Sequence, residues 1–309
     1  MAHTCFSGTF GGMKEMKVVY GHTDSIYVQI DSVEEAQESI KEIEASVREH
    51  FPNVMGLEQH PVVLEFEKYY SALGVGTTKN RNAGMIIWDD GEWLKEPKFT
   101  MTGFTAKRVS ETPFAKEIQT SALKQWVNQE PLGKINVRLN VLHASVLNGE
   151  IPIASLIKRS RLKSDRFTVK CSECNLKHDL HDCLTIQWCS RCGTETRNFV
   201  TLQGKRPSVG SGIAGVLYAK QKLNMAFDDS YLFMKVKHND TFINPLTKEE
   251  KVVEYMSGTT YEDFNDYEPD WEHYAQQVVK KAEPIYRAMN WDLSSIRTGK
   301  LQTKLEDWF

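Results

Sequence analysis

The chain has 309 residues, of which 40% are hydrophobic and 26% are charged, and its formal net charge is -3. This length allows one or two domains, and no apolar run is long enough to cross a bilayer. The first twelve residues lack the basic start and long apolar centre of a secretory signal, so we expect a cytoplasmic protein without a membrane partner. Because the balance is slightly acidic, any contact with nucleic acid would use local basic patches.

The first predicted element is a β-hairpin that turns near Gly21. β-Branched and aromatic residues occupy its strand positions, which are Val18, Tyr20, Ile26, Val28 and Ile30. Gly21 permits a turn backbone that a residue with a Cβ would resist, so Asp24 is expected to project from a rigid tip. Thr-Asp-Ser is also ordinary turn chemistry, and alone it favours a hairpin without a catalytic role.

A helix and two strands are predicted after the hairpin. Ser32 and Glu35 form a capping box, and apolar residues then recur at helical spacing at Val33, Ala36, Ile40, Ile43 and Val47. Residues 51–53 end this helix. Residues 62–70 are predicted to form a buried strand, and residues 85–88 form another before a turn at 89–91. The order strand, helix, strand, strand indicates an α+β domain.

Several motifs in this region resemble those of one enzyme family. Tyr20-Gly21-His22-Thr23-Asp24-Ser25 matches motif C of family-B DNA polymerases, Tyr-Gly-Asp-Thr-Asp-Ser, at five of six positions. Residues 64–70 look like the palm strand of that family, and residues 79–84 are similar to its Lys-Lys-Arg-Tyr-Ala-Gly segment. A thumb-entry pattern of Gly-x-x-x-Arg-Arg and a helix with Lys and Gln is matched by Gly103, Lys107, Arg108, Lys116 and Gln119. The resemblance is strong to about residue 125 and weaker beyond it.

The resemblance implies a partial β-α-β-β polymerase palm over residues 1–105 and a mostly helical thumb over residues 106–300. In such a palm, two divalent ions activate the primer hydroxyl and neutralise the leaving pyrophosphate. Asp24 would hold Mg²⁺ or Mn²⁺, and Glu67 is a candidate supporting carboxylate whose alternative is a solvated strand face. His22 stands where the family has its first motif C aspartate, and its nitrogen is a poor ligand for Mg²⁺.

Four basic residues are candidate contacts for the phosphates of a primer–template. Lys79 and Arg81 are expected to share a strand face, and Lys107 with Arg108 follow at the entry to the thumb. Ordinary surface solvation is the alternative for all four residues.

Two Cys-x-x-Cys pairs separated by fourteen residues are the clearest local signal, and they comprise Cys171, Cys174, Cys189 and Cys192. Four thiolates at this spacing predict one structural Zn²⁺, and Gly193 fits the tight turn of the second pair. Disulfides are the alternative, which the absence of a secretory signal disfavours. The nearby His178, His181 and Cys183 are interpreted as bystanders. The zinc ribbon, at about residues 166–198, is expected to be an insertion in the thumb with a structural or DNA-contacting role.

Two helices and a tail complete the chain. A glycine-containing basic stretch at 204–212 precedes a predicted helix at 213–223, and an apolar stripe predicts a second helix whose core positions are Trp271, Tyr274, Val278, Ala282 and Ile285. Residues 301–309 resemble a sliding-clamp-binding peptide, in which one face of a helical turn presents Leu305, Trp308 and Phe309 to an apolar pocket and Gln302 hydrogen-bonds beside it. Docking of these aromatic residues on the thumb itself is the alternative.

In the family, the exonuclease domain, the motif A aspartate and the fingers helix precede motif C. The resemblance therefore implies the carboxy-terminal subunit or fragment of a split DNA-directed DNA polymerase, similar to two-subunit enzymes of some archaea. Its expected partners are primer–template DNA, dNTP, an amino-terminal polymerase subunit and a sliding clamp. The alternative is a non-catalytic DNA- and clamp-binding subunit that descends from a polymerase and is inactivated at His22.

Overall fold

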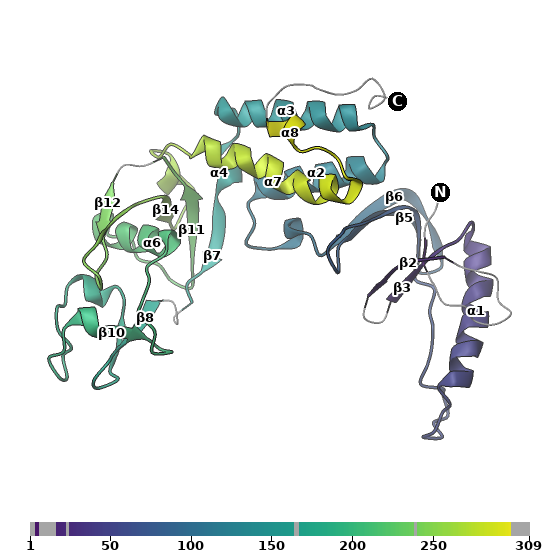
Figure 1. Ribbon diagram of the computed structural model, residues 1–309, viewed down its shortest axis with the longest axis horizontal. Coiled ribbons are helices and arrows are strands. Elements are labelled where there is room, and N and C mark those ends of the chain that lie inside the picture. Colours follow the sequence, from purple (N-terminus) through teal and green to yellow (C-terminus); the bar gives the residue numbers. More distant parts are fainter. Residues whose placement is uncertain (1–3, 6–16, 23–24, 164–166, 238–239, 298–309) are drawn as a thin grey trace. The chain divides into compact units, whose positions relative to one another are not determined.

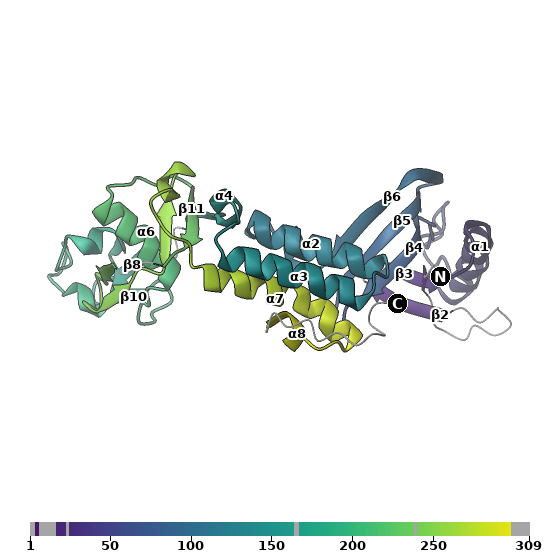
Figure 2. The same ribbon diagram turned by 90° about the horizontal axis from the view of Figure 1, so that it is seen from above.

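The computed structural model describes residues 4–5, 17–22, 25–163, 167–237 and 240–297 (Figure 1). The chain divides into two compact units, of which unit 1 comprises residues 1–107, 118–140 and 279–309, and unit 2 comprises residues 108–117 and 141–278. Figure 2 shows the same elements from above. Among the helices that the structure describes, none combines the length and the apolar character needed to cross a bilayer.

Unit 1 begins with a small sheet and a helix. Strands β2 (Lys17–His22) and β3 (Ser25–Gln29) form the predicted hairpin, and β1 (Thr4–Cys5) pairs with β3 in parallel, which gives the order β1-β3-β2. Helix α1 (Val33–His50) follows, and the Ser32 hydroxyl accepts a hydrogen bond from the Glu35 amide at 3.0 Å. The predicted helix and its cap are confirmed, because the Ser32 side chain satisfies a first-turn amide.

A second antiparallel sheet has the order β4-β5-β6 and comprises β4 (Lys68–Val75), β5 (Asn82–Asp89) and β6 (Glu92–Thr102). Asp90 and Gly91 connect β5 to β6 with φ of 48° and 94°. Both angles suit the two-residue turns that match the twist of a hairpin. The predicted turn is therefore confirmed.

The predicted strand over residues 62–70 is wrong for residues 62–67, because β4 begins at Lys68. The Val62 carbonyl accepts from the Arg48 Nε at 3.0 Å, and the Glu67 carbonyl accepts from the Asp90 amide at 2.9 Å. In the described part of the chain, no strand pairs with residues 62–67. Alternating apolar and polar residues therefore produce no sheet ladder here, since a ladder also needs a neighbouring strand.

Helices complete unit 1, and three of them extend into unit 2. These are α2 (Pro113–Val127), α3 (Leu132–Leu147) and α7 (Trp271–Met289), whereas α8 (Ser294–Arg297) and the short 3-10 helix η1 (Thr105–Lys107) belong to unit 1. In unit 1, the Tyr286 hydroxyl of α7 donates to the Asn136 side chain of α3. The stripe predicted on α7 is core, because Tyr274, Val278, Ala282 and Ile285 are all buried.

Unit 2 contains an antiparallel sheet that the sequence analysis did not anticipate. Its order is β14-β11-β7, from β14 (Tyr255–Gly258), β11 (Ser230–Lys235) and β7 (Lys158–Arg161). Helix α6 (Ser211–Lys222), which the sequence predicted, packs on β14 so closely that a Cβ on Gly215 would lie 2.1 Å from the Tyr255 carbonyl oxygen. Only glycine fits at this position.

Smaller elements complete unit 2. They are α4 (Ile153–Leu156), the hairpin of β12 (Thr241–Ile243) and β13 (Glu250–Val252), and η4 (Glu262–Phe264). The Cys-rich region forms its own sheet of order β10-β8-β9, from β8 (Thr168–Cys171), β9 (Lys177–Asp179) and β10 (Phe199–Thr201), together with η2 (Asp182–Leu184) and η3 (Thr196–Asn198).

Candidate functional site

The six-residue motif at 20–25 lies on the β2–β3 hairpin. Tyr20 pairs with Tyr27, Gly21 pairs with Ile26, and the His22 backbone pairs with Ser25. Asp24, which is the predicted metal ligand, lies outside the described residues, as does the side chain of His22. The hairpin thus places the motif at the end of two paired strands, and the roles of Asp24 and His22 stay predictions.

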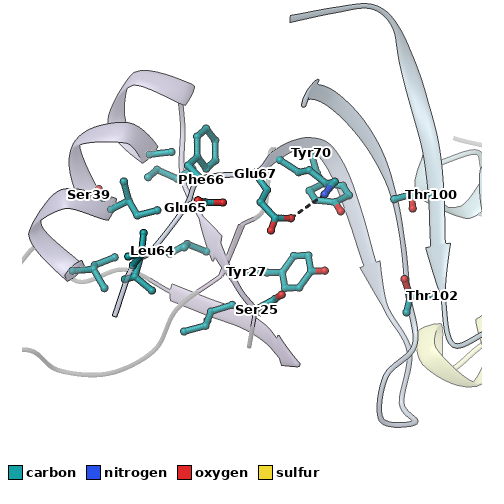
Figure 3. Close-up of a pocket in the computed structure, with 18 residues that line it drawn as sticks. Ser25, Tyr27, Ser39, Leu64, Glu65, Phe66, Glu67, Tyr70, Thr100 and Thr102 are labelled. Carbon is teal, nitrogen blue, oxygen red and sulfur yellow. Dashed lines mark hydrogen bonds and ion pairs between the residues drawn. The ribbon is translucent and has the colours of Figure 1, made fainter. Parts of the chain in front are cut away.

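A cavity of about 550 Å³ lies beside this hairpin (Figure 3). Its walls come from β3, from one face of α1, from residues 63–68 and from the strands β4 and β6. Glu67 lines the cavity together with Ser25 and Tyr27, and its carboxylate accepts from the Lys68 ammonium at 3.0 Å. The Glu67 side chain is 59% exposed, so it is free to reorient toward a cation, and its predicted supporting role stays a prediction.

Three tyrosines form a connected group, and two of them, Tyr27 and Tyr70, line this cavity. The ring centroids of Tyr20 and Tyr27 lie 5.3 Å apart, and those of Tyr27 and Tyr70 lie 6.0 Å apart. Burial raises the pKa of both Tyr27 and Tyr70 above its usual range, so both phenols are neutral hydrogen-bonding groups near pH 7. The Tyr20 hydroxyl is buried and has no hydrogen-bond partner among the described residues.

The expectation that Lys79 and Arg81 share a strand face is wrong. Both residues lie in the turn between β4 and β5, on either side of Asn80, whose φ is 62°. Asparagine tolerates this left-handed conformation better than most residues, and the turn it makes takes its two basic neighbours out of the ladder. Lys79 is exposed and Arg81 is half-buried.

Gly103 brings this turn against the segment that carries Lys107. A Cβ on Gly103 would lie 1.8 Å from the Asn80 carbonyl oxygen and 3.2 Å from the Arg81 Cγ, and the φ of Gly103 is 74°. Both the contact and the dihedral angle require glycine. The turn that carries Lys79 and Arg81 therefore packs against Gly103, four residues before Lys107. Arg108 is exposed and is the first residue of unit 2.

A buried polar cluster holds the backbone just before Lys107. The Gln119 Oε1 accepts from the Thr105 hydroxyl at 3.0 Å and from the Ala106 amide at 2.8 Å. The Lys281 ammonium donates to the Thr105 hydroxyl at 3.1 Å, although Lys281 is only 8% exposed. Because a buried amide and a buried ammonium are costly without partners, these bonds fix η1 relative to α2 and α7 within unit 1.

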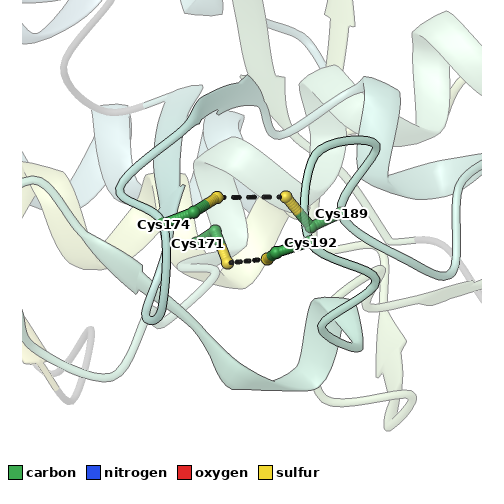
Figure 4. Close-up of side chains that lie close together, drawn as sticks. All are labelled: Cys171, Cys174, Cys189 and Cys192. Carbon is green, nitrogen blue, oxygen red and sulfur yellow. Dashed lines mark hydrogen bonds between the residues drawn. The ribbon is translucent and has the colours of Figure 1, made fainter.

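The four predicted cysteines come together in unit 2 (Figure 4). Their sulfur atoms lie within 4.8 Å of one another, and the Cys171–Cys192 and Cys174–Cys189 pairs are each separated by 3.5 Å. Tetrahedral Zn–S bonds of about 2.3 Å place sulfur atoms about 3.8 Å apart. The separations are much longer than the S–S bond of about 2.05 Å in a disulfide. The arrangement therefore fits one four-coordinate metal ion.

The two halves of this centre have the same local backbone. In each pair, the residue directly after the second cysteine closes a turn on the first cysteine. The Asn175 amide donates to the Cys171 carbonyl at 3.1 Å, and the Gly193 amide donates to the Cys189 carbonyl at 2.9 Å. Asn175 and Gly193 have φ of 58° and 71°. The turn at Gly193 was predicted from the sequence, whereas its equivalent at Asn175 was not, although the parallel Cys-x-x-Cys-Asn and Cys-x-x-Cys-Gly patterns indicate both.

The residues interpreted as bystanders lie outside the sulfur cluster. His178 stacks on the Phe199 ring at 4.7 Å, and Cys183 is fully buried with its thiol directed at the Asp179 carbonyl at 3.6 Å. Burial raises the pKa of Cys183 to about 12, which keeps it a neutral thiol. The Thr194 hydroxyl lies 3.1 Å from the Cys192 sulfur, and its hydrogen bond, together with that of the Thr194 amide, is the main cause that lowers the pKa of Cys192 to about 6. No sequence pattern indicates this role for the threonine.

Comparison with known proteins identifies the family. The profile of DNA polymerase family B matches residues 4–182, which is more than half of the chain, so the chain belongs to DNA polymerase family B. The expected resemblance is thereby confirmed. The fold is similar to the structure of the family B DNA polymerase from the hyperthermophilic archaeon Pyrobaculum calidifontis, with a TM-score of 0.50 and 15% sequence identity. That match covers 87% of this chain and 26% of that polymerase, so this chain spans about a quarter of its length. A comparison with curated proteins gave no match.

Proposed function

We propose that this chain is the carboxy-terminal subunit or fragment of a split family-B DNA-directed DNA polymerase, contributing to template-directed nucleotide addition. It would supply motif C, the thumb and a sliding-clamp-binding tail, and an amino-terminal polymerase subunit would supply the remainder. The observation that carries this proposal is the family match, which includes the motif at residues 20–25 on the β2–β3 hairpin.

In this proposal the carboxylates and the basic residues have distinct roles. Asp24 would hold Mg²⁺ or Mn²⁺, and such an ion would neutralise the charge that develops on the leaving pyrophosphate. Glu67, which lines the cavity beside the hairpin, would assist as an additional carboxylate. Lys79, Arg81, Lys107 and Arg108 would contact primer–template phosphates, which is supported by the contact of the turn at Asn80 with Gly103, four residues before Lys107. Residues 1–105 would be the palm part, and 106–300 would be the thumb.

The zinc ribbon would have a structural role. Its described residues 167–201 contain four Lys or Arg and four Asp or Glu, and four thiolates on one Zn²⁺ add a net charge of -2. A surface without excess positive charge is a poor platform for nucleic acid phosphates, so the charge balance supports a folding role over DNA contact. The tail residues Gln302, Leu305, Trp308 and Phe309 lie outside the described residues, and the clamp proposal rests on their spacing alone.

The second candidate is a non-catalytic DNA- and clamp-binding subunit that descends from a polymerase. The observation that favours it is His22, which stands at the first aspartate of motif C. A neutral imidazole suits Zn²⁺ or Mn²⁺ better than Mg²⁺, so the substitution weakens the case for magnesium-dependent chemistry.

Primer extension separates the two candidates. The chain is mixed with the amino-terminal polymerase polypeptide encoded in the same genome, and nucleotide addition is measured with Mg²⁺ and with Mn²⁺. For a split polymerase, we expect extension by the wild-type complex and a loss of at least about a thousandfold in Asp24→Ala, since removal of a metal ligand removes the charge neutralisation. Extension that is absent from the wild type but present in His22→Asp would establish the inactivated subunit. Asp90→Ala, at the exposed β5–β6 turn, is the control that removes a carboxylate elsewhere.

A further inference from the structure

The loop that follows α1 (Figure 1) contains several exposed apolar side chains. The exposed fractions are 64% for Phe51, 88% for Val54, 79% for Met55 and 48% for Leu57. Single exposed apolar residues are common on protein surfaces, but four within seven consecutive residues form a patch of the kind that marks an interaction site. We name residues 51–57 the apolar loop.

Hydrogen bonds fix the backbone of the apolar loop in this exposed form. The Asn53 side chain donates from Nδ2 to the Leu57 carbonyl at 2.6 Å, and its Oδ1 accepts from the Leu57 amide at 3.1 Å. The Val54 amide donates to the Pro52 carbonyl at 2.8 Å, and Gly56 adopts a φ of 63°. A loop ordered in advance loses less conformational entropy when it binds, so these bonds favour recognition by a partner.

Charge around the apolar loop excludes two kinds of partner. Residues 48–60 contain one Lys or Arg, which is Arg48, and they also contain Glu49 and Glu58. Arg48 is engaged, because it pairs with Glu44 and donates to the Val62 carbonyl. Nucleic acid binding and attachment to an anionic membrane both depend on available cations beside the binding surface. The loop therefore suits an apolar pocket on a protein.

We propose that the apolar loop is a docking site for the polypeptide that supplies the polymerase parts absent from this chain. This inference rests on the proposed function, since it identifies where the amino-terminal subunit binds. It is supported by the coverage of the archaeal polymerase, of which this chain spans 26%. In the proposed split enzyme, the other parts of the polymerase belong to the amino-terminal subunit, which must contact the palm part for nucleotide addition. An ordered apolar loop on the palm part offers side chains that lose their water on binding, and such side chains supply most of the binding energy of an interface.

The test measures the affinity of the full chain for the amino-terminal polymerase polypeptide of the same genome, by biolayer interferometry. Val54→Asp and Met55→Asp are each expected to weaken binding at least about tenfold, because a carboxylate cannot enter an apolar pocket without loss of hydration. Asn53→Ala is expected to weaken it about threefold through loss of loop order. The matched control is Val141→Asp, which replaces a valine that is 61% exposed on α3 and should leave the affinity unchanged.

Two further measurements distinguish a failure of the docking proposal from a failure of the proposed function. Primer extension measured at saturating partner should be equal in Val54→Asp and wild type, whereas Asp24→Ala should bind the partner normally and fail in extension. Equal affinities of Val54→Asp, Met55→Asp and wild type would overturn the docking site and leave the split polymerase intact. Absence of binding between the wild-type chain and the amino-terminal polypeptide would overturn the assignment of this loop to that subunit. A wild-type dimer in sedimentation that Val54→Asp abolishes would overturn it as well, because the loop would then bind a second copy of this chain.

Discussion

Unit 1, which contains the proposed palm part, and the Cys-rich ribbon of unit 2 are stabilised in different ways. In unit 1, residues far apart in sequence make the decisive contacts, such as Gly103 against Asn80 and Lys281 against Thr105. In the ribbon, four cysteines within 22 consecutive residues converge around a single point. Unit 1 therefore depends on the exact packing of a polypeptide core, whereas the four thiols of the ribbon are placed to hold it together through one bound ion.

This contrast teaches where each region is vulnerable. A ribbon with a small core loses most of its folding free energy with its metal, because apparent binding free energies of about 10 to 16 kcal/mol are coupled to folding in such domains. The palm part instead has a continuous apolar cluster of Ile30, Val33, Ala36, Tyr69 and Trp88, which spreads its stability over many contacts. Loss of the metal should therefore unfold the whole ribbon, whereas the loss of one side-chain contact in the palm part should lower its free energy of unfolding by only part of the total.

The largest expected effect comes from removal of the metal. Chelation, or the substitution Cys171→Ser, should unfold the ribbon because the remaining thiolates cannot hold the ion in a closed four-coordinate site. Amide hydrogen exchange should lose protection across residues 167–201 and keep it in α1. Elemental analysis should find one zinc per wild-type chain and less than about a tenth of that in Cys171→Ser.

Cys183→Ala provides the control for this experiment. Cys183 is buried in the same ribbon but lies outside the sulfur cluster, so its variant should retain one zinc per chain. Loss of zinc from Cys183→Ala, or full protection of residues 167–201 without metal, would contradict the assignment of the four ligands.

The next largest effect is expected at Gly103. Alanine there would place its Cβ 1.8 Å from a backbone carbonyl that cannot rotate away, in addition to the strain of a φ of 74°. We expect Gly103→Ala to lower the free energy of unfolding by about 3 kcal/mol or more, measured by urea denaturation. If Lys79 and Arg81 contact DNA phosphates as proposed, the displaced turn should also weaken binding to a primer–template duplex.

Gly56→Ala separates the effect of the steric contact at Gly103 from the effect of a positive φ. Gly56 has a φ of 63°, and nothing lies within 4 Å of an added Cβ. Its substitution should therefore cost only about 1 kcal/mol, which is the usual penalty for a left-handed alanine. Equal losses of unfolding free energy in Gly103→Ala and Gly56→Ala would show that the close contact of Gly103 with Asn80 adds nothing to the stability.

The sequence predicted those features whose cause lies within a few residues. Ser32 caps α1 because its hydroxyl reaches an amide three positions ahead, and the turn at Asp90–Gly91 follows from two residues that tolerate positive φ. The metal centre was predictable for the same reason, since the Cys-x-x-Cys spacing itself brings two thiolates to one turn.

Features that depend on distant partners could not be predicted in the same way. Residues 62–67 alternate like a strand, but they lack a strand partner in the described part of the chain. Strand β11 pairs with β7 and β14, and this sheet joins Lys158 to Gly258 across a hundred residues, so no local pattern specifies it. The turn at Asn80 escaped prediction because a single left-handed residue decides the direction of Lys79 and Arg81.

The smallest expected effect is at Thr194, beside the metal centre. Its hydroxyl lowers the pKa of Cys192, so Thr194→Val should raise that pKa from about 6 toward the ordinary value for a thiol. The thiolate is the zinc ligand, and a lowered pKa keeps it deprotonated until the pH falls through about 6. Thr194→Val should therefore weaken zinc binding about tenfold at pH 7, with a larger loss at pH 6, measured by competition with a chromogenic chelator. Thr194→Ser retains the hydroxyl and should keep the wild-type affinity, whereas a wild-type affinity in Thr194→Val would show that the hydroxyl does not act on Cys192.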